Sequence, residues 1–301
     1  MSFVSSIDIV IPCYNVGHIV DKCIASILNQ NHIDKVKIYL VEDGSTDNTK
    51  KVIDQFAHNG NIKIIYHKLN QGLAAARNSG VNAGCGEVIL FLDSDMTVNP
   101  DWIDKLIVPF SNKNIVGVVG EQELPSQLTA NSLDRYLYSK YRGARQFGQS
   151  EHLHFRYFLF SNTGIRRSAL NEVGIFDEKI KSYGGEDLDL ALRVWKQYPT
   201  SLRFVSGAVS YHWGQKTISE FYKNMELYGG NNFKYLIDKH PLYIKEFGGD
   251  LVNSFKGKIL FNLLIKLAVY HLSRIKPHPI FIRYLIIYST IKGAQTKNAI
   301  D

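Results

Sequence analysis

Apolar runs and helical patterns alternate through the first hundred residues, and this alternation limits the fold more than any other feature of the sequence. Four short runs are rich in β-branched and large apolar residues: 7–11, 36–41, 62–66 and 88–92. Helical patterns over 16–29, 49–56 and 73–83 separate them. Continuous apolar strands that alternate with helices are typical of a parallel sheet covered on both faces. We therefore predict an α/β fold built on a mostly parallel sheet.

The composition is that of a folded chain in a reducing compartment. Apolar residues make up 45% of the sequence and aromatic residues 12%, which is enough for a sizeable core. The three cysteines form no CxxC pair, which argues against a disulfide framework or a structural zinc site. Because the N-terminus lacks the pattern of a secretory signal, we expect a cytoplasmic location.

The net charge of +7 is confined to the C-terminal part of the sequence. Residues 251–301 contain eight Lys or Arg side chains and one acid. A nucleic-acid binder would carry such an excess as a patch on its folded body, so we expect no nucleic-acid partner. The apolar segments 259–272 and 279–291 are shorter than the roughly 20 residues that span a bilayer. We predict peripheral membrane contact through this tail; packing on the protein, or an oligomer interface, is the alternative.

Polar residues collect directly after the predicted strands, in 12–15, 42–45 and 93–95. Ligands of open parallel sheets bind beyond the carboxyl ends of the strands. Asp93 and Asp95 are two residues apart, so both carboxylates reach the same side, where they repel unless a cation lies beside them. This pattern indicates a divalent cation, Mg²⁺ or Mn²⁺, although a DxD sequence also occurs in ordinary polar loops.

Two further segments strengthen the prediction of a ligand site. Glu42 and Asp43 precede a turn and can accept hydrogen bonds from a base or ribose; the alternative is a turn that caps the next helix. Arg77 lies on a helix of small residues that can pack close to the sheet, and it offers a cation toward the same edge. A surface arginine is the alternative.

Together these motifs resemble the family 2 glycosyltransferases of the GT-A fold. The matching segments span about 200 residues: 9–15, 42–49, 72–80, 93–95, 162–167 and 185–187. The resemblance implies an inverting transfer from a nucleotide-diphosphate sugar, most often UDP-linked, by a hexosyl- or hexosaminyl-type transferase. The acceptor would be a hydroxyl of a glycan or a lipid-linked acceptor.

The same resemblance assigns residues to the donor site. It implies that the nucleotide pocket is lined by Pro12, Tyr14, Glu42, Asp43 and Arg77. We extend the predicted donor site to their neighbours in the same motifs, namely Asn15, Ser45, Gly72, Asn78, Asp93 and Ser94. Glu42 stands where these enzymes usually have an aspartate, and its longer side chain can alter the fit to the base.

The metal and the catalytic base complete the predicted site. The metal ligands are Asp93, Asp95 and, by the resemblance, His212, whose imidazole favours Mn²⁺; a core histidine beside Trp213 is the alternative. Asp187 is the candidate base, with Glu186 as its support. Both acids open a predicted helix, where the helix dipole and capping alone would favour them.

We predict a GT-A catalytic domain over 1–215, with a nucleotide-binding half (1–97) and an acceptor half (98–215). A helical extension (216–250) and a basic amphipathic helical tail (251–301) follow as an appendage. Two other functions stay open: a non-catalytic protein that binds nucleotide sugars or glycans, and a sugar nucleotidyltransferase. The latter needs a glycine-rich phosphate loop after the first strand, where this chain has only Gly17.

Overall fold

The computed structural model describes residues 4–140, 142–148, 151–275 and 278–296. The chain divides into two compact units, and each is described by itself. The first comprises Met1–Thr129, Lys140–Lys179 and Glu186–Gly214. The second comprises Ala130–Ser139, Ile180–Gly185 and Gln215–Asp301.

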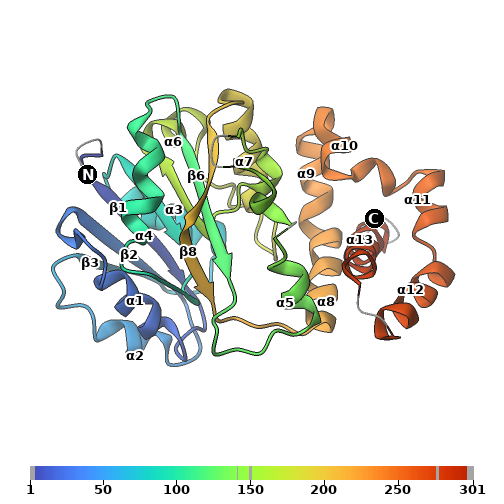
Figure 1. Ribbon diagram of the computed structural model, residues 1–301, viewed down its shortest axis with the longest axis horizontal. Helices are drawn as coiled ribbons and strands as arrows, with labels where there is room; N and C mark the ends of the chain where they lie inside the picture. Colours follow the sequence, from blue (N-terminus) through green and yellow to red (C-terminus); the bar gives the residue numbers. More distant parts are fainter. Residues whose placement is uncertain (1–3, 141, 149–150, 276–277, 297–301) are drawn as a thin grey trace. The chain divides into compact units, whose positions relative to one another are not determined.

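The first unit is built on an eight-stranded sheet with the order β3-β2-β1-β4-β7-β6-β8-β5. Figure 1 labels β1, β2, β3, β6 and β8 of this sheet. Its strands are β1 Ile7–Cys13, β2 Val36–Asp43, β3 Ile62–His67, β4 Val88–Leu92, β5 Met96–Val98, β6 Gly117–Glu123, β7 Asn162–Arg166 and β8 Leu202–His212. Pairing is parallel from β3 through β2 and β1 to β4, and between β6 and β8. It is antiparallel for β4 with β7, β6 with β7 and β5 with β8. The prediction of a mostly parallel α/β sheet is confirmed.

The helices of the first unit connect and cover these strands. They are α1 Val20–Leu28, α2 Thr49–Asp54, α3 Leu73–Ala83, α4 Trp102–Ile107, α6 Arg167–Val173 and α7 Glu186–Gln197. Short 3-10 turns lie at Ile33–Lys35, Val108–Ser111, Gly143–Gln146 and Phe155–Tyr157. The pattern that predicted a helix from residue 16 is wrong at its start, because 16–19 form a turn and α1 begins at Val20.

Side chains of β1 alternate between two helix-covered faces, as strand geometry requires. Ile9 and Ile11 belong to a core cluster that includes Cys23 and Ile24 of α1. Val10 points to the opposite face, toward α3. A Cβ at Gly80 of α3 would lie 2.4 Å from Val10 Cγ1, so only glycine permits this close approach. The predicted packing of a small-residue helix against the sheet is confirmed.

Two strand boundaries differ from the sequence patterns. Pro12 does not end β1, which continues to Cys13. The ladder of β1 with β4 ends at Val10, so Pro12, which has no N–H, interrupts no hydrogen bond on that side. The expected pair of strands at 202–205 and 208–211 is one strand, β8, whose pairing with β6 shifts register between Gly120 and Glu121.

The second unit is helical in its described residues. Its elements are α5 Ser132–Leu137, α8 Ile218–Tyr228, a π-helical segment Gly229–Phe233, α9 Lys234–Lys239, α10 Ile244–Phe247, α11 Phe255–Leu260, α12 Leu263–Ile275 and α13 Pro279–Thr296, with 3-10 turns at Pro241–Tyr243 and Gly249–Leu251. A Cβ at Gly229 would lie 2.0 Å from Thr290 O, so the π-helical segment and α13 pack closely there. The expected helix over 259–272 is wrong, because it is divided between α11 and α12. None of the helices in the described ranges has the length and apolar character to cross a membrane.

Candidate active site

The candidate site lies in the first unit, beyond the carboxyl ends of parallel strands. The chain leaves β4 at Leu92, passes through Asp93, Ser94 and Asp95, and re-enters the sheet as β5. Because Met96 of β5 pairs with His212 of β8, the sheet register brings His212 next to Asp95. The contact between Asp95 and His212, which lie far apart in the sequence, is therefore a consequence of the β5–β8 ladder.

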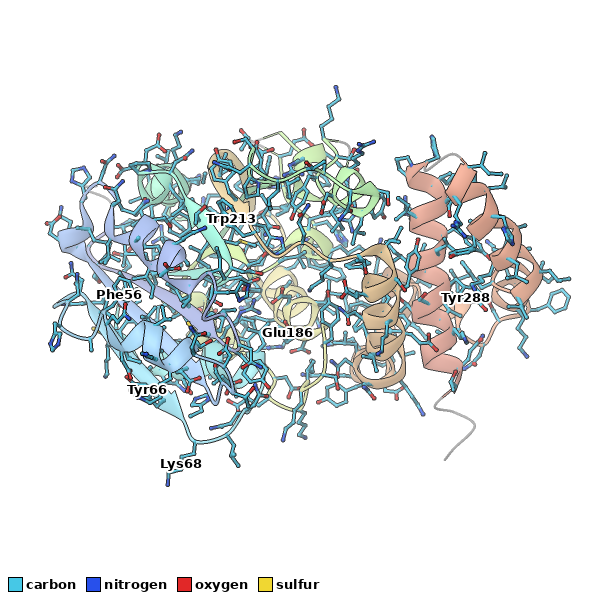
Figure 2. The ribbon with its side chains drawn as sticks, turned by 90° about the horizontal axis from the view of Figure 1, so that it is seen from below. Phe56, Tyr66, Lys68, Glu186, Trp213 and Tyr288 are labelled. Carbon is cyan, nitrogen blue, oxygen red and sulfur yellow. The ribbon has the colours of Figure 1, made fainter. Side chains whose placement is uncertain are left out.

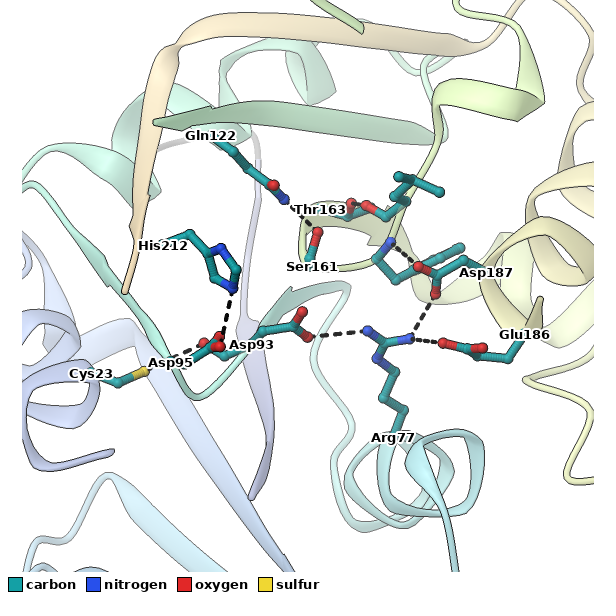
Figure 3. A network of polar contacts seen from close by, with 12 residues as sticks. Cys23, Arg77, Asp93, Asp95, Gln122, Ser161, Thr163, Glu186, Asp187 and His212 are labelled. Atoms are coloured by element: carbon teal, nitrogen blue, oxygen red, sulfur yellow. Dashed lines mark hydrogen bonds and ion pairs between the residues drawn. The ribbon is translucent and has the colours of Figure 1, made fainter. Parts of the chain in front are cut away.

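Arg77 of α3 is the centre of a network of carboxylates (Figure 3). Its Nη1 lies 2.6 Å from Asp187 Oδ1 and 3.4 Å from Glu186 Oε1, and its Nη2 lies 3.1 Å from Asp93 Oδ1. The side chain is 1% exposed, so Arg77 is not the surface arginine that was the alternative. Nε has no hydrogen-bond partner. The Phe176 ring centroid is 5.3 Å from Cζ.

Burial and neighbouring charges in this network shift several pKa values. Burial by itself would lower the pKa of Arg77, but Asp187, Asp93 and Glu186 outweigh it and raise the pKa. Burial raises the pKa of Glu186 to about 7, and the neighbouring Asp187 carboxylate adds to the rise. Burial also raises the pKa of Asp93, against the opposing effect of Arg77. The network holds more carboxylates than cations, which favours a positively charged ligand nearby.

The Asp187 carboxylate is held from two directions. Oδ1 accepts from Arg77, and Oδ2 accepts the backbone N–H of Phe160 at 3.2 Å. Glu186 is the first residue of α7 (Figure 2), and it is buried, at 5% exposure. The helix starts where the sequence predicted it. Asp189 of the same turn is fully buried and pairs with Arg193 at 2.9 Å, as expected of a structural acid.

Asp95 and His212 form a second pair, with His212 Nε2 3.0 Å from Asp95 Oδ2. Both side chains keep partial solvent access, at 29% and 23% exposure. A Cβ at Gly214 would lie 2.3 Å from Asp95 Oδ2 and 3.0 Å from His212 Nε2. Glycine at this position therefore leaves a space that any side chain would fill. The indole N–H of Trp213, the next residue, donates to Thr97 Oγ1 at 3.0 Å.

The predicted three metal ligands do not meet in one cluster. Asp93 turns to Arg77, whereas Asp95 turns to His212. Across the described part of the chain, no group of three or more His, Cys, Asp or Glu side chains is arranged to hold a metal ion. The carboxylate and imidazole of Asp95 and His212 nevertheless suit Mn²⁺, and the space at Gly214 lies beside both donor atoms.

Asp43 is buried at the end of β2, and its carboxylate accepts hydrogen bonds from the loop before α3. Its carboxylate accepts the N–H groups of Gln71 at 2.9 Å and Gly72 at 3.0 Å, and the Asn70 amide at 3.0 Å. His67 Nδ1 lies 2.6 Å from Asp43 Oδ1. Asp43 thus fixes the loop that starts α3, the helix of Arg77. Sequence reasoning missed His67, which is the last residue of β3 and has no acid beside it in the sequence.

The loops after β1 and β2 hold each other. Asn15, at a φ of 53°, donates its N–H to Ser45 Oγ at 3.1 Å and accepts from Thr46 N at 2.8 Å. Glu42 Oε1 accepts the N–H of Ser45 at 2.6 Å. Asp47 Oδ1 accepts from Thr49 N at 2.9 Å, so the turn binds the first N–H of α2, although the N-cap residue Asn48 makes no side-chain capping bond. Glu42, Ser45 and Asn15 therefore shape this edge of the sheet together.

The remaining predicted donor-site residues lie apart from these networks. Tyr14 is 46% exposed, whereas Pro12 lies within β1 and Ser94 is buried. Asn78 is buried too, and its amide donates to Phe176 O at 3.0 Å and Glu178 Oε1 at 2.8 Å. The Asn78 side chain is thus engaged with the chain around Phe176.

The sheet order, with carboxylates beyond its parallel strands, defines an α/β protein of the GT-A glycosyltransferase fold. The chain belongs to glycosyl transferase family 2, because the model of that family matches residues 8–174, more than half of its length. It is 26% identical over 239 residues to the chondroitin synthase of Escherichia coli, a match that covers 69% of this chain. The chain spans only about a third (35%) of that synthase.

Solved structures share the fold at low sequence identity. The mannosyltransferase PcManGT of Pyrobaculum calidifontis, in complex with GDP-Man and Mn²⁺, matches with a TM-score of 0.68 at 14% identity, covering 98% of this chain and 87% of that one. TarS 1-349 of S. aureus, in complex with UDP-GlcNAc, matches with a TM-score of 0.55 at 14% identity, covering 98% and 92%.

Proposed function

We propose that this chain is a metal-dependent, inverting glycosyltransferase that moves a sugar from a nucleotide-diphosphate sugar to an acceptor hydroxyl. One observation carries the proposal: Arg77 joins Asp187, the candidate base, to Asp93 of the loop that also carries Asp95. A base and a cation-binding pair are what displacement of a nucleoside diphosphate requires. Family membership supports the same class of reaction.

Asp187 is the proposed general base. As the acceptor oxygen forms a bond to the anomeric carbon, the bond from that carbon to the diphosphate oxygen breaks, and Asp187 takes the hydroxyl proton. Attack opposite the leaving group inverts the anomeric centre. Arg77 and the Phe160 N–H fix the carboxylate, which keeps its oxygens directed while the proton moves. Glu186, beside it on Arg77, acts as a support.

Asp95 and His212 are the residues that would hold the cation, Mn²⁺ in preference to Mg²⁺ because of the imidazole. Such an ion neutralises charge on the departing diphosphate as a Lewis acid. We assign Asp93 to the ribose or to the surroundings of the metal. The ion pair of Asp93 with Arg77 connects the donor side of the site to the base.

For the donor we propose a UDP-linked hexose or hexosamine. The S. aureus TarS structure is a complex with UDP-GlcNAc, and the P. calidifontis mannosyltransferase structure is a complex with GDP-Man and Mn²⁺. Tyr14 is the exposed aromatic side chain of the predicted pocket. Asp43 and Gly72 contribute indirectly, by fixing the loop before α3.

The acceptor we propose is a glycan or a lipid-linked glycan, and the reaction takes place in the cytoplasm or at the cytoplasmic face of a membrane. The similarity to a chondroitin synthase supports a polysaccharide product. Residues 1–215 form the proposed catalytic domain, with nucleotide binding in 1–97 and acceptor binding in 98–215. The residues after 215 supply the helical extension and the tail.

The two alternatives are less well supported. A nucleotidyltransferase needs a glycine-rich loop for phosphates, but a Cβ at Gly17 would lie 2.0 Å from Asn48 Oδ1. Gly17 is therefore required for packing against the turn before α2. A binding protein without activity would not need a base held by both an arginine and a backbone N–H.

Thermal denaturation with a panel of nucleotide sugars, each with and without Mn²⁺, tests the proposal. A specific donor should raise the melting temperature by mass action, and more so with the ion. Release of nucleoside diphosphate from that donor should then depend on Mn²⁺. Stabilisation without any release would favour the binding protein, whereas release of pyrophosphate from a nucleoside triphosphate and a sugar phosphate would favour the nucleotidyltransferase.

A further inference from the structure

Exposed apolar side chains are concentrated on α11 and α12 of the second unit. Of the 20 exposed large apolar side chains in the described residues, ten lie between Phe255 and Ile275. Phe255 and Leu264 are each 79% exposed, and Ile275 is 83% exposed. Single exposed apolar side chains are ordinary, but a contiguous group of this kind marks an interaction surface. We call the exposed side chains of 255–275 the α11–α12 surface.

The segment that joins α11 to α12 packs on Tyr284 of α13. Phe261, between the two helices, stacks on Tyr284 with ring centroids 5.4 Å apart. The Tyr284 hydroxyl donates to Leu260 O at 2.8 Å. The exposed side chains therefore belong to helices that are already held, and binding would not require them to fold first.

All charges of the surface are positive. The sequence contains no Asp or Glu from 251 to 300, and α11 and α12 carry Lys256, Lys258, Lys266 and Arg274. The Lys266 ammonium lies 5.5 Å from the Tyr270 ring centroid, so its stem follows the apolar face. The partner must accept apolar side chains and also carry negative charge.

Length and charge decide between the partners. At 13 residues α12 is about 20 Å long, short of the roughly 30 Å of a bilayer core. If a second copy of this chain bound here through the same surface, the cations of the two copies would repel each other. This repulsion disfavours a dimer. The headgroups and acyl boundary of an anionic bilayer offer both the apolar and the negative component.

We propose that the α11–α12 surface docks this chain on an anionic membrane, with Phe255, Leu264 and Ile275 inserted at the headgroup boundary. Lys256, Lys258, Lys266 and Arg274 then meet lipid phosphates. This inference specifies the membrane contact predicted from the tail and does not depend on glycosyl transfer.

Sedimentation of the full chain with lipid vesicles tests the proposal without any donor present. We expect binding to phosphatidylcholine vesicles that contain phosphatidylglycerol, weaker binding to phosphatidylcholine alone, and a fall in binding at high salt. Combining Phe255→Ser, Leu264→Ser and Ile275→Ser should reduce the affinity at least tenfold. Combining Lys258→Gln, Lys266→Gln and Arg274→Gln should reduce it about fivefold for each cation.

Matched variants separate the surface from general effects. Leu242→Ser removes an apolar side chain that is 91% exposed outside α11 and α12, and Lys35→Gln, Lys63→Gln and Lys113→Gln remove three exposed cations of the first unit. These variants should bind vesicles as the unaltered chain does. Near-ultraviolet circular dichroism checks that every variant is folded, and hydrogen exchange should show protection of 255–275 on anionic vesicles.

Three results would overturn the proposal: no binding of the unaltered chain to anionic vesicles, equal binding by the serine variant, or a dimer in sedimentation equilibrium that the serine substitutions abolish. The last would assign the surface to a second copy. Because Mn²⁺-dependent release of nucleoside diphosphate is measured in solution, failure of docking and failure of the proposed transfer are distinguishable.

Discussion

Arg77 Nη1 lies 2.6 Å from Asp187 Oδ1, although the two residues are 110 positions apart in the sequence. The guanidinium also contacts Asp93 and Glu186, so one buried cation holds three carboxylates. Buried charges are stable only when they are paired. The arrangement links the candidate base to the DxD loop, and the following predictions depend on it.

Asp187→Asn should remove transfer and leave donor binding intact. The amide has the size of the carboxylate but cannot take a proton from the acceptor, so we expect kcat to fall by about 10² to 10⁴. Steady-state kinetics and titration calorimetry with the donor measure the two effects. Asp21→Asn, an exposed acid in α1, is the matched control. Loss of donor affinity in Asp187→Asn would count against its role as base.

Arg77→Met should destabilise the protein by about 3 to 5 kcal/mol, because it leaves carboxylates that are partly or wholly buried without their cation. Urea unfolding followed by circular dichroism measures the change. Arg135→Met replaces an exposed arginine of α5 and should change the free energy of unfolding little. If Arg77→Met unfolds at the same urea concentration as the unaltered chain, the network does not have the structural role described above.

Glu186→Gln should stabilise the protein at alkaline pH. Folding raises the pKa of Glu186 from its ordinary value of 4.5 to about 7. The native state therefore binds more protons between these values, and stability falls as the pH rises from 4.5 through 7. The glutamine amide does not titrate, so the variant does not lose stability in this range. Its free energy of unfolding should exceed that of the unaltered chain by about 1 to 3 kcal/mol at pH 8 and differ little from it at pH 4.5.

Urea unfolding at several pH values measures this gain, and Glu123→Gln, at an exposed position, is the control. A difference between Glu186→Gln and the unaltered chain that stays constant from pH 4.5 to 8 would contradict the raised pKa.

Gly214→Ala should weaken the response to Mn²⁺. The added Cβ would lie 2.3 Å from Asp95 Oδ2, so the carboxylate has to move from His212. We expect the concentration of Mn²⁺ for half-maximal activity to rise at least tenfold, and Asp95→Ala to abolish metal-dependent turnover. At Gly60 a Cβ would meet no atom within 4 Å, so Gly60→Ala is the control. An unchanged Mn²⁺ titration in Gly214→Ala would show that the ion binds elsewhere.

Local patterns predicted much of the fold. The helix over 73–83 and the strand over 88–92 lie where expected, because both are defined by periodicity and small or apolar side chains within one segment. The acids at 186 and 187 were likewise expected to open a helix, and they do. The strand boundary at Pro12 was predicted wrongly because it depends on a neighbouring strand. Pro12 can continue β1 because no residue of β4 pairs with it.

The candidate site could be predicted only in part. The residue types Asp93, Asp95, Asp187 and His212 were chosen from strand ends, motifs and resemblance. The sequence did not indicate which of these side chains contact each other. Asp95 pairs with His212, 117 positions away, whereas Asp93 pairs with Arg77. His67 and the Phe160 N–H were missed because nothing beside them in the sequence marks them as partners of Asp43 and Asp187.

The sequence by itself determined the alternation of strands and helices, the small-residue face of α3 and the positive charge of the tail. These properties depend on residues within a turn or two of one another. Only the tertiary structure decided that Arg77 joins Asp93 to Asp187 and that Gly214 leaves room beside Asp95 and His212. Contacts across a hundred residues depend on strand register and on which helix covers which face, and no short segment contains that information.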